Sequence, residues 1–300
     1  MRYGDAVAFR QALERRLKTQ AAGDGARLAR DRKRVVFERF LARLLAVAPG
    51  GWLLKGGFAL DLRLAGRARA TRDVDIEWRV GEDDLLDALI KAAAYDAGDF
   101  FVYSIERAEA PEDRLGGSHR FSVAASLGGR PFEAFPLDVG LRREPDAGVE
   151  MLSAGDLLEF ARVEPVFVPA VPLERQAAEK LHAYTRTYAG SRASTRVKDL
   201  VDLALIAELF PLNAATLLEE IEATFAVRGT HTAPSTLPLP PDDWRAPFRR
   251  LSEAAGVSGD LRGGHSTAAA LVDPILGATV ERGTWDFEGR RWTAPRVEPS

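Results

Sequence analysis

The sequence predicts an α+β fold, with a mixed β-sheet in the first half of the chain and helices in the second half. Alternating apolar and polar residues, typical of half-buried strands, are concentrated before residue 150. After that point the apolar residues recur at the spacing of amphipathic helices. With 300 residues, 46% of them apolar, the chain can form two cores. We therefore expect two domains, residues 1–150 and residues 151–300.

The first predicted elements are a helix, a strand and a second helix. Residues 27–46 carry apolar side chains at a spacing near 3.6, and a Pro-Gly-Gly sequence ends the stretch. A short apolar run over 52–54 is predicted as a strand, and residues 58–64 as a helix. The glycine pair Gly56 and Gly57 lies between them, which indicates a tight turn from strand to helix.

Residues 71–80 alternate strictly between apolar and polar side chains, which predicts a strand with one apolar and one charged face. Asp73 and Asp75 belong to the charged face. The other elements predicted in the first half are a helix over 83–94, a strand over 100–106, and a hairpin of 119–127 and 130–141 around a Gly-Gly turn.

The second half is predicted to be mainly helical. A sequence like a capping box at Ser153 suggests that helical structure begins there. The proline-rich residues 228–241 indicate a loop, and residues 281–300 show no clear period. Helices are expected over 174–188, 195–210, 213–225, 241–255 and 267–280.

Composition limits the class of protein. The chain has no cysteine, which excludes disulfides and Cys-ligated zinc, so any metal must be held mainly by oxygen. It has no long apolar run and its first residues do not resemble a signal peptide, so we expect a soluble, cytoplasmic protein without membrane contact. A net charge of −3 argues against nonspecific coating of nucleic acid and leaves room for a local basic patch.

Asp73 and Asp75 are the residues that most clearly indicate chemistry. Two residues apart on a strand, their side chains project from one face about 7 Å apart, so both can bind one hydrated Mg²⁺ or bridge two ions. Phosphoryl transfer needs such a site, because metal ions neutralise the triphosphate and activate the attacking hydroxyl. Asp138, on a later strand, is the best candidate for a third carboxylate. Glycines at the preceding turn allow the backbone to approach a phosphate closely.

Three stretches of the sequence resemble one family. LLKGGFALDLRLAGRARATRDVDIEW, at 53–78, resembles the polymerase β nucleotidyltransferase signature, specifically that of the AbiEii/AbiGii-type (MenT-like) toxins. PLDVG, at 136–140, resembles the third acidic strand of that family. AAEKLHAYTRTYAGSRASTRVKDLVDLALI, at 177–206, resembles its two helical motifs. The resemblance implies a polymerase β-like nucleotidyltransferase domain followed by a helical domain.

The resemblance also implies roles for individual residues. Metal binding falls to Asp73 and Asp75, with Asp138 in support. Lys180 would contact the triphosphate, and Asp199 matches the essential aspartate of the second helical motif. Asp202, one helical turn later, could share the role of Asp199.

The glycine turn and one hydroxyl are assigned to the nucleotide. Gly56 and Gly57 would bring backbone groups close to the phosphates. Gly57 stands where many members of the superfamily have a serine, so here the backbone alone would make that contact. Thr71, two positions before Asp73, is placed to touch the nucleotide.

The function implied is that of a toxin from a bacterial toxin–antitoxin pair that transfers a nucleotide from an NTP, using Mg²⁺ or Mn²⁺. The expected partners are an RNA acceptor, with the tRNA 3′ end first, and a cognate antitoxin; no DNA is expected. Arginines near the site could follow the RNA phosphates: Arg63, Arg67, Arg69, Arg72, Arg186, Arg192 and Arg196. Two alternatives stay open, namely transfer to a small molecule such as an antibiotic, and a catalytically silent member that binds RNA or protein.

Overall fold

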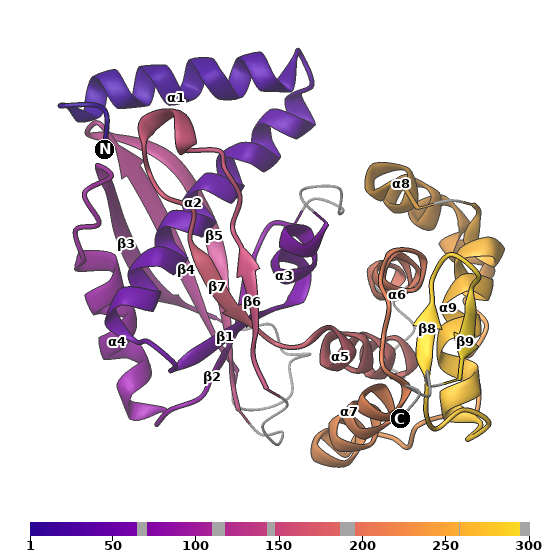
Figure 1. Cartoon of the computed structure of the whole chain (residues 1–300). Helices are drawn as coiled ribbons and strands as arrows, with labels where there is room; N and C mark the ends of the chain where they lie inside the picture. Colours follow the sequence, from indigo (N-terminus) through magenta and orange to yellow (C-terminus); the bar gives the residue numbers. More distant parts are fainter. Residues whose placement is uncertain (65–70, 110–117, 143–147, 187–195, 258, 295–300) are drawn as a thin grey trace, which may run out of the picture. The chain divides into compact units, whose positions relative to one another are not determined.

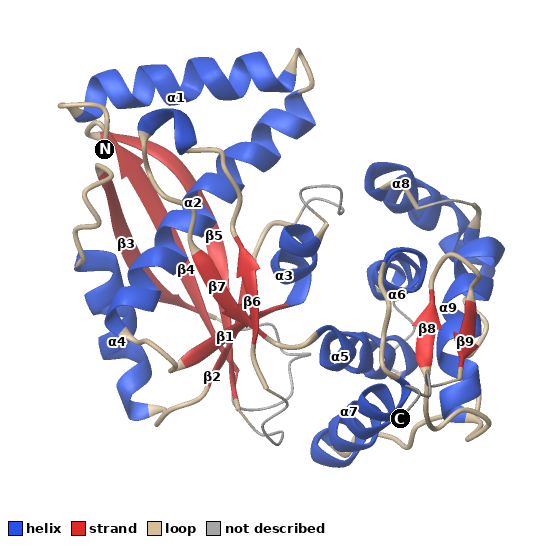
Figure 2. Cartoon of the chain, viewed as in Figure 1, coloured by secondary structure: helices blue, strands red, loops and turns tan. Residues whose placement is uncertain are grey.

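The computed structural model describes residues 1–64, 71–109, 118–142, 148–186, 196–257 and 259–294. The chain divides into two units. Unit 1 comprises residues 1–66, 70–142 and 149–170, and unit 2 comprises residues 67–69, 143–148 and 171–300. Figure 1 follows the chain through both, and Figure 2 shows the large sheet in unit 1 and mostly helices in unit 2. The predicted α+β class is confirmed.

Within the described residues, the strands of unit 1 form one mixed sheet of seven strands in the order β3-β4-β5-β2-β1-β7-β6. Strand β2 runs parallel to β5, and β1 runs parallel to β7, while the other neighbours are antiparallel. The apolar face of β2 lies in the core, where Val74 and Ile76 are fully buried. The strands are β1 (Trp52–Lys55), β2 (Val74–Trp78), β3 (Phe101–Ala108), β4 (Ser118–Leu127), β5 (Arg130–Leu141), β6 (Glu150–Ser153) and β7 (Phe167–Ala170).

Four helices pack with this sheet: α1 (Ala6–Ala21), α2 (Gly25–Val47), α3 (Gly56–Arg63) and α4 (Asp83–Ala94). The last three were predicted. Helix α1 was not, although Phe9, Leu13 and Leu17 recur every four residues and are fully buried. Asp5 begins α1 by accepting a hydrogen bond from the backbone N–H of Ala8.

The sheet continues beyond the predicted domain boundary. Strands β6 and β7 belong to it, so unit 1 extends to Ala170 and the helical unit begins at Val171, later than residue 151. The helix expected after Ser153 is wrong: only a short 3-10 helix forms there, η1 (Glu159–Ala161). The physical reason is that β7 pairs with both β6 and β1, and β1 lies more than 100 residues before it along the chain.

Unit 2 consists of helices and one small hairpin. Its elements are α5 (Leu173–Thr185), α6 (Val197–Leu209), α7 (Ala214–Arg228), η2 (Asp242–Trp244), α8 (Arg245–Ala255), α9 (Leu261–Leu276), β8 (Thr284–Asp286) and β9 (Arg291–Thr293). The five predicted helices are therefore present. The hairpin was not expected in the aperiodic tail; it is anchored by Trp285, which is buried and donates from its indole N–H to the Ala207 carbonyl at 2.8 Å. Among the described residues, no helix has the length and apolarity that crossing a membrane demands.

A group of buried charges lies between α2 and the loop before β3. Arg43 and Arg39 donate to the Asp99 carboxylate at distances between 2.5 and 2.8 Å. Glu38 lies beside them, only 2% exposed, with its carboxylate 3.9 Å from the Arg39 guanidinium. Burial raises the pKa of Glu38 from 4.5 to about 7, because removing the carboxylate from water disfavours its charged form.

We expect Glu38 to make the stability of unit 1 depend on pH. Since its folded-state pKa of about 7 exceeds the unfolded value of 4.5, its contribution is complete below pH 4.5 and is lost as the pH rises through 7. Relative to Glu38→Gln, the wild type should lose about 2–3 kcal/mol of unfolding free energy between pH 4.5 and 8. Urea unfolding at several pH values measures this. The exposed Glu106→Gln serves as control, and parallel curves for Glu38→Gln and wild type would refute the assignment.

Candidate active site

Asp75 and Asp138 lie side by side in the sheet of unit 1. Strands β2 and β5 are parallel and place the two residues directly opposite each other. Adjacent strands lie about 4.8 Å apart, so the two side chains leave the same face as neighbours. Their chain neighbours Ile76 and Val139 point into the core on the other face. The structure thus places Asp138, the candidate third carboxylate, beside Asp75 of the expected pair, although the two residues are far apart along the chain.

The glycine turn touches Asp75. Lys55, the last residue of β1, is paired with Asp75, and Gly56 follows with a φ of +70°. A Cβ on Gly56 would overlap the Asp75 carboxylate and lie 2.7 Å from its Cγ. Both the backbone conformation and the close approach therefore require glycine here. Gly57 is the second residue of α3, whose N-terminus has no side-chain cap.

Thr71 supports Asp73. The Thr71 hydroxyl donates to the Asp73 carboxylate at 3.0 Å, and only 8% of Thr71 is exposed. Asp73 directly precedes β2, two residues before Asp75. The hydroxyl predicted to touch a nucleotide is thus bonded to one of the two key carboxylates in this structure.

Arg120 holds Asp138, a contact that sequence reasoning missed. The guanidinium donates two hydrogen bonds of 2.8 Å, one to each oxygen of the Asp138 carboxylate, which is 2% exposed. The hydrogen bonding to Asp138 raises the pKa of Arg120, and the nearby charges of Asp73 and Asp75 act in the same direction. A fixed positive charge therefore lies among the three carboxylates.

Lys55 adds a second positive charge to the same sheet face. Its ammonium lies 3.1 Å from the position that a Cβ on Gly140 would occupy, so the side chain extends toward β5. The absence of a side chain at Gly140, two residues after Asp138, leaves space for it. The sequence offered one signal for Lys55, namely its place at the end of a strand just before the glycine pair.

The carboxylate oxygens of this site suit a hard divalent cation that binds together with a phosphate-bearing substrate. Within the described residues, no three acidic, histidine or cysteine side chains are arranged to hold a metal ion by themselves. Mg²⁺ is commonly held by one or two carboxylates, with water and phosphate oxygens completing its shell. Asp73 and Asp75 fit that requirement. Each oxygen of Asp138 accepts one hydrogen bond from Arg120 and has a second lone pair, so its ligation of a metal stays a prediction.

The predicted residues of the helical motifs meet inside unit 2. The Lys180 ammonium, on α5, lies 3.2 Å from the Asp199 carboxylate and 2.8 Å from that of Asp202, both on α6. Arg196 contacts Asp199 at 3.1 Å. Asp199 and Asp202 are 2% and 0% exposed. One lysine thus serves both aspartates, and the structure gives no reason to prefer either.

We expect Lys180→Ala to destabilise unit 2, because it leaves two buried carboxylates without their ammonium. Loss of one partner from a buried ion pair costs about 3–5 kcal/mol. A lower midpoint of thermal unfolding should reveal this. Lys198→Ala removes the same charge from the same motif at a half-buried position with no ion pair in the described residues, and should change the midpoint little. Equal midpoints for the two variants would argue against a structural role for Lys180.

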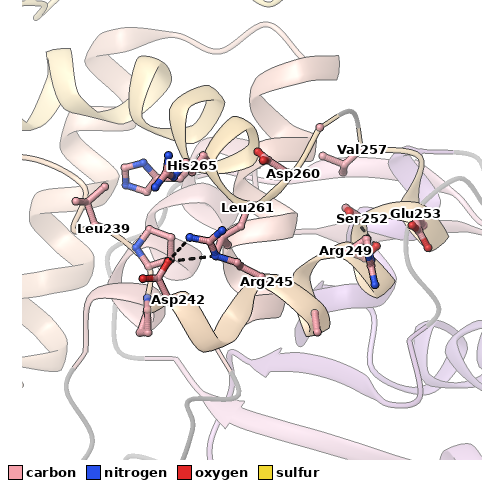
Figure 3. A pocket seen from close by; sticks show the side chains of 15 residues that line it. Leu239, Asp242, Arg245, Arg249, Ser252, Glu253, Val257, Asp260, Leu261 and His265 are labelled. Atoms are coloured by element: carbon pink, nitrogen blue, oxygen red, sulfur yellow. Dashed lines mark hydrogen bonds and ion pairs between the residues drawn. The ribbon is translucent and has the colours of Figure 1, made fainter.

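Unit 2 also contains a pocket of about 1150 Å³ that none of the predicted site residues lines. Figure 3 shows Arg245, Arg249 and His265 around it, with Asp242 paired to Arg245 at 2.6 Å. Its acidic and basic side chains balance, since Asp242, Glu253 and Asp260 face Arg245, Arg249 and Arg262. The pocket therefore has no marked preference for an anion.

The structure shows the surroundings of several of the arginines that were predicted to follow the RNA phosphates. Arg63 forms an ion pair with Glu150 at 2.6 Å, which joins α3 to β6, and Arg196 is bonded to Asp199. Arg72 is exposed. Arg67, Arg69 and Arg192 lie outside the described residues.

Comparison with known proteins points to one family. The family model "Nucleotidyl transferase AbiEii toxin, Type IV TA system" matches residues 39–262. The fold is similar to that of MenT4, a nucleotidyltransferase toxin from Mycobacterium tuberculosis, with a TM-score of 0.54 and 18% identity over 90% of this chain and 99% of that one. JHP933 from Helicobacter pylori aligns with a TM-score of 0.44 and 17% identity, covering 83% and 92% of the two chains. A search of curated proteins gives no match.

Proposed function

Because this chain belongs to the AbiEii family of nucleotidyltransferase toxins of type IV toxin–antitoxin systems, we propose that it transfers a nucleoside monophosphate from an NTP to RNA. The expected acceptor is the 3′ end of tRNA, and modification there would block translation. The observation that carries this proposal is the in-register pair of Asp75 and Asp138 beside the Gly56 turn. Membership of a toxin–antitoxin family also implies a cognate antitoxin.

In the proposed reaction, the 3′ hydroxyl oxygen of the acceptor attacks the α-phosphorus of the NTP. A new P–O bond forms, the bond between the α-phosphorus and the bridging oxygen breaks, and pyrophosphate leaves while the hydroxyl proton passes to solvent. A Mg²⁺ or Mn²⁺ ion held by Asp73 and Asp75 would neutralise phosphate charge and lower the pKa of the attacking hydroxyl.

Other residues are proposed to bind the nucleotide and to orient the metal-binding carboxylates. Gly56 and Gly57 allow the backbone at the start of α3 to approach the phosphates, where the helix N-terminus favours negative charge. Thr71 keeps the Asp73 carboxylate in position by its hydrogen bond. Arg120 offsets the repulsion between the carboxylates and the incoming triphosphate. Lys180 is assigned to the triphosphate by the family motif, and its substitution should raise the KM for NTP.

The test is incubation of the protein with total tRNA, Mg²⁺ and each labelled NTP in turn. Label should enter tRNA with one or more NTPs in the wild type, and should not do so with Asp73→Ala or when EDTA replaces Mg²⁺. Incorporation that persists in Asp73→Ala would contradict the site. Absence of any incorporation with the wild type would favour the alternative of a catalytically silent RNA- or protein-binding member.

Transfer to a small cationic acceptor, such as an aminoglycoside antibiotic, has less support. A cationic acceptor calls for an acidic surface around the site. Here the guanidinium of Arg120 and the ammonium of Lys55 lie on the same sheet face as the carboxylates. These two cations offset part of the charge of the three carboxylates, so the site is less acidic than a cationic acceptor calls for.

A further inference from the structure

Positive charge is concentrated at the start of the chain. Residues 1–34 carry ten basic and four acidic side chains, whereas the remaining 266 residues carry 31 basic and 40 acidic ones. The first segment thus has a net charge of +6 in a protein whose total is −3. Such local concentration in an acidic protein creates a surface that attracts anions.

Part of this charge serves the fold. Arg10 on α1 donates to the carbonyls of Leu127 and Arg130 at the β4–β5 turn, at 2.8 and 3.0 Å. On α2, Arg32 donates to the Phe132 carbonyl at 2.5 Å. These side chains attach the helical hairpin formed by α1 and α2 to the sheet.

A second group faces solvent. We call it the basic hairpin face: Arg15, Lys18 and Arg27, all exposed. Within the described part of the chain, the side chains of Arg15 and Lys18 form no ion pair or hydrogen bond, and Arg27 has only a 3.8 Å contact with Asp31. Their removal should therefore leave the fold intact, since in that part of the chain Arg15 and Lys18 make no such contact and the single contact of Arg27, with the buried Asp31, is long at 3.8 Å.

The side chains around these cations suit a partner that carries phosphates better than they suit a protein partner. The other exposed side chains of the middle and end of α1 include Gln11 and Thr19, and no large apolar side chain is exposed between Gln11 and Arg27. Protein interfaces have an apolar centre. Polyanion sites instead use exposed lysine and arginine side chains without an apolar centre.

The face lies at the end of unit 1 away from the carboxylates. Helix α1 crosses the sheet at the β4–β5 turn (Figure 1), where a Cβ on Gly128 would lie 3.3 Å from the Ala6 carbonyl. Asp138 lies eight residue steps along β5 from Arg130 at that turn. At about 3.4 Å per step, roughly 27 Å separates the turn from Asp138. The turn contacts the start of α1, whereas Arg15 and Lys18 lie near the other end of that helix. Only an acceptor RNA that extends well beyond its 3′ end could contact both the basic hairpin face and the catalytic carboxylates.

We propose that the basic hairpin face binds the phosphate backbone of the acceptor RNA at a distance from the nucleotide that is modified. This inference rests on the proposed function and adds to it a selection of acceptors by length. A large structured RNA gains affinity from the face, whereas a short oligonucleotide with the same 3′ end does not.

The test compares the full-length chain with the triple variant Arg15→Gln/Lys18→Gln/Arg27→Gln. The KM for tRNA should rise about tenfold or more near 0.15 M salt, with kcat unchanged, because each lost phosphate contact removes a salt-dependent part of the affinity. The dependence of log KM on log salt should become shallower by about two to three. With a trinucleotide matching the tRNA 3′ end as acceptor, variant and wild type should have the same KM.

A matched variant removes the same charge elsewhere. Arg249→Gln/Arg250→Gln/Arg262→Gln changes three exposed arginines of unit 2 and should leave the KM for tRNA near that of the wild type. An equal rise in both triple variants would show that total charge sets the affinity, and would overturn the inference. So would an unchanged KM and salt dependence in the hairpin variant while the wild type labels tRNA. A wild type that labels no RNA would overturn the proposed function and the inference with it.

Discussion

Asp75→Ala is expected to lower kcat for nucleotide transfer by about 10³-fold or more. Asp75 is next to Asp138 on the neighbouring strand and contacts the glycine turn, so its loss removes a carboxylate from the centre of the site. Stabilisation of transition-state charge by a metal is worth several kcal/mol, and each 1.36 kcal/mol is tenfold in rate. Single-turnover labelling of tRNA with excess enzyme measures the rate without a contribution from product release.

The control for charge and folding is Asp87→Ala. Asp87 is an exposed carboxylate of α4 in the same unit, and among the residues that the structure describes it pairs only with Lys91 on the surface. Its replacement should leave kcat within about twofold of the wild type, as expected for an exposed pair. Circular dichroism should show the same fold for both variants. If Asp75→Ala kept even a tenth of the wild-type rate, Asp75 could not belong to the catalytic site.

Gly56→Ala is expected to impair both activity and stability. A non-glycine residue at a φ of +70° costs about 1–2 kcal/mol, and the added Cβ would also collide with the Asp75 carboxylate. The carboxylate must then rotate or move away from the turn. Since small displacements at a reacting centre can cost about 10²-fold in rate, we expect a loss of at least that size.

Gly50→Ala separates the two effects. Gly50 has a φ of +72°, almost the same backbone conformation, but a Cβ there would meet nothing within 4 Å. It should lose similar stability in urea unfolding and keep normal kcat. Equal losses of kcat in both glycine variants would mean that strain alone, without contact to Asp75, explains the result for Gly56.

The parts of the site that could be predicted depend on local patterns. The strict alternation around Asp73 and Asp75 indicated which face each side chain takes, because side chains on a strand alternate between its two faces. Gly56 and Gly57 indicated a turn because few other residues adopt a positive φ. Asp138 was found through its flanking apolar residues, which indicated an alternating strand. The family resemblance supplied Lys180 and Asp199, which local patterns alone could not distinguish from surface charges.

Arg120 could not be predicted, because its position depends on an irregularity in the hairpin. Next to the turn, Leu127 pairs with Arg130, but the register shifts between Ala125 and Ser126. A register counted from the turn without this shift would place Arg120 opposite Leu137. A slip of one residue moves a side chain to the other face of the sheet, and the sequence contains no clear signal for the bulge.

Strands β6 and β7 were not predicted for a similar reason. β6 and β7 are four residues each, too short for a periodic pattern, and β7 joins the sheet through β1, which lies far away in the sequence. Tertiary pairing therefore decided their structure. Helix α1 is different: its apolar residues follow a helical spacing, and Asp5 provides a start signal, so the information was present in the sequence.

The pairing of β2 with β5 has a consequence during protein synthesis. The two carboxylates that it unites come from segments separated by α4, β3 and β4, and no local piece of chain contains both. A ribosome that has produced β2 but not yet β5 carries only half of the pair. The pair is therefore complete only after the whole hairpin has left the exit tunnel and β5 has paired with β2.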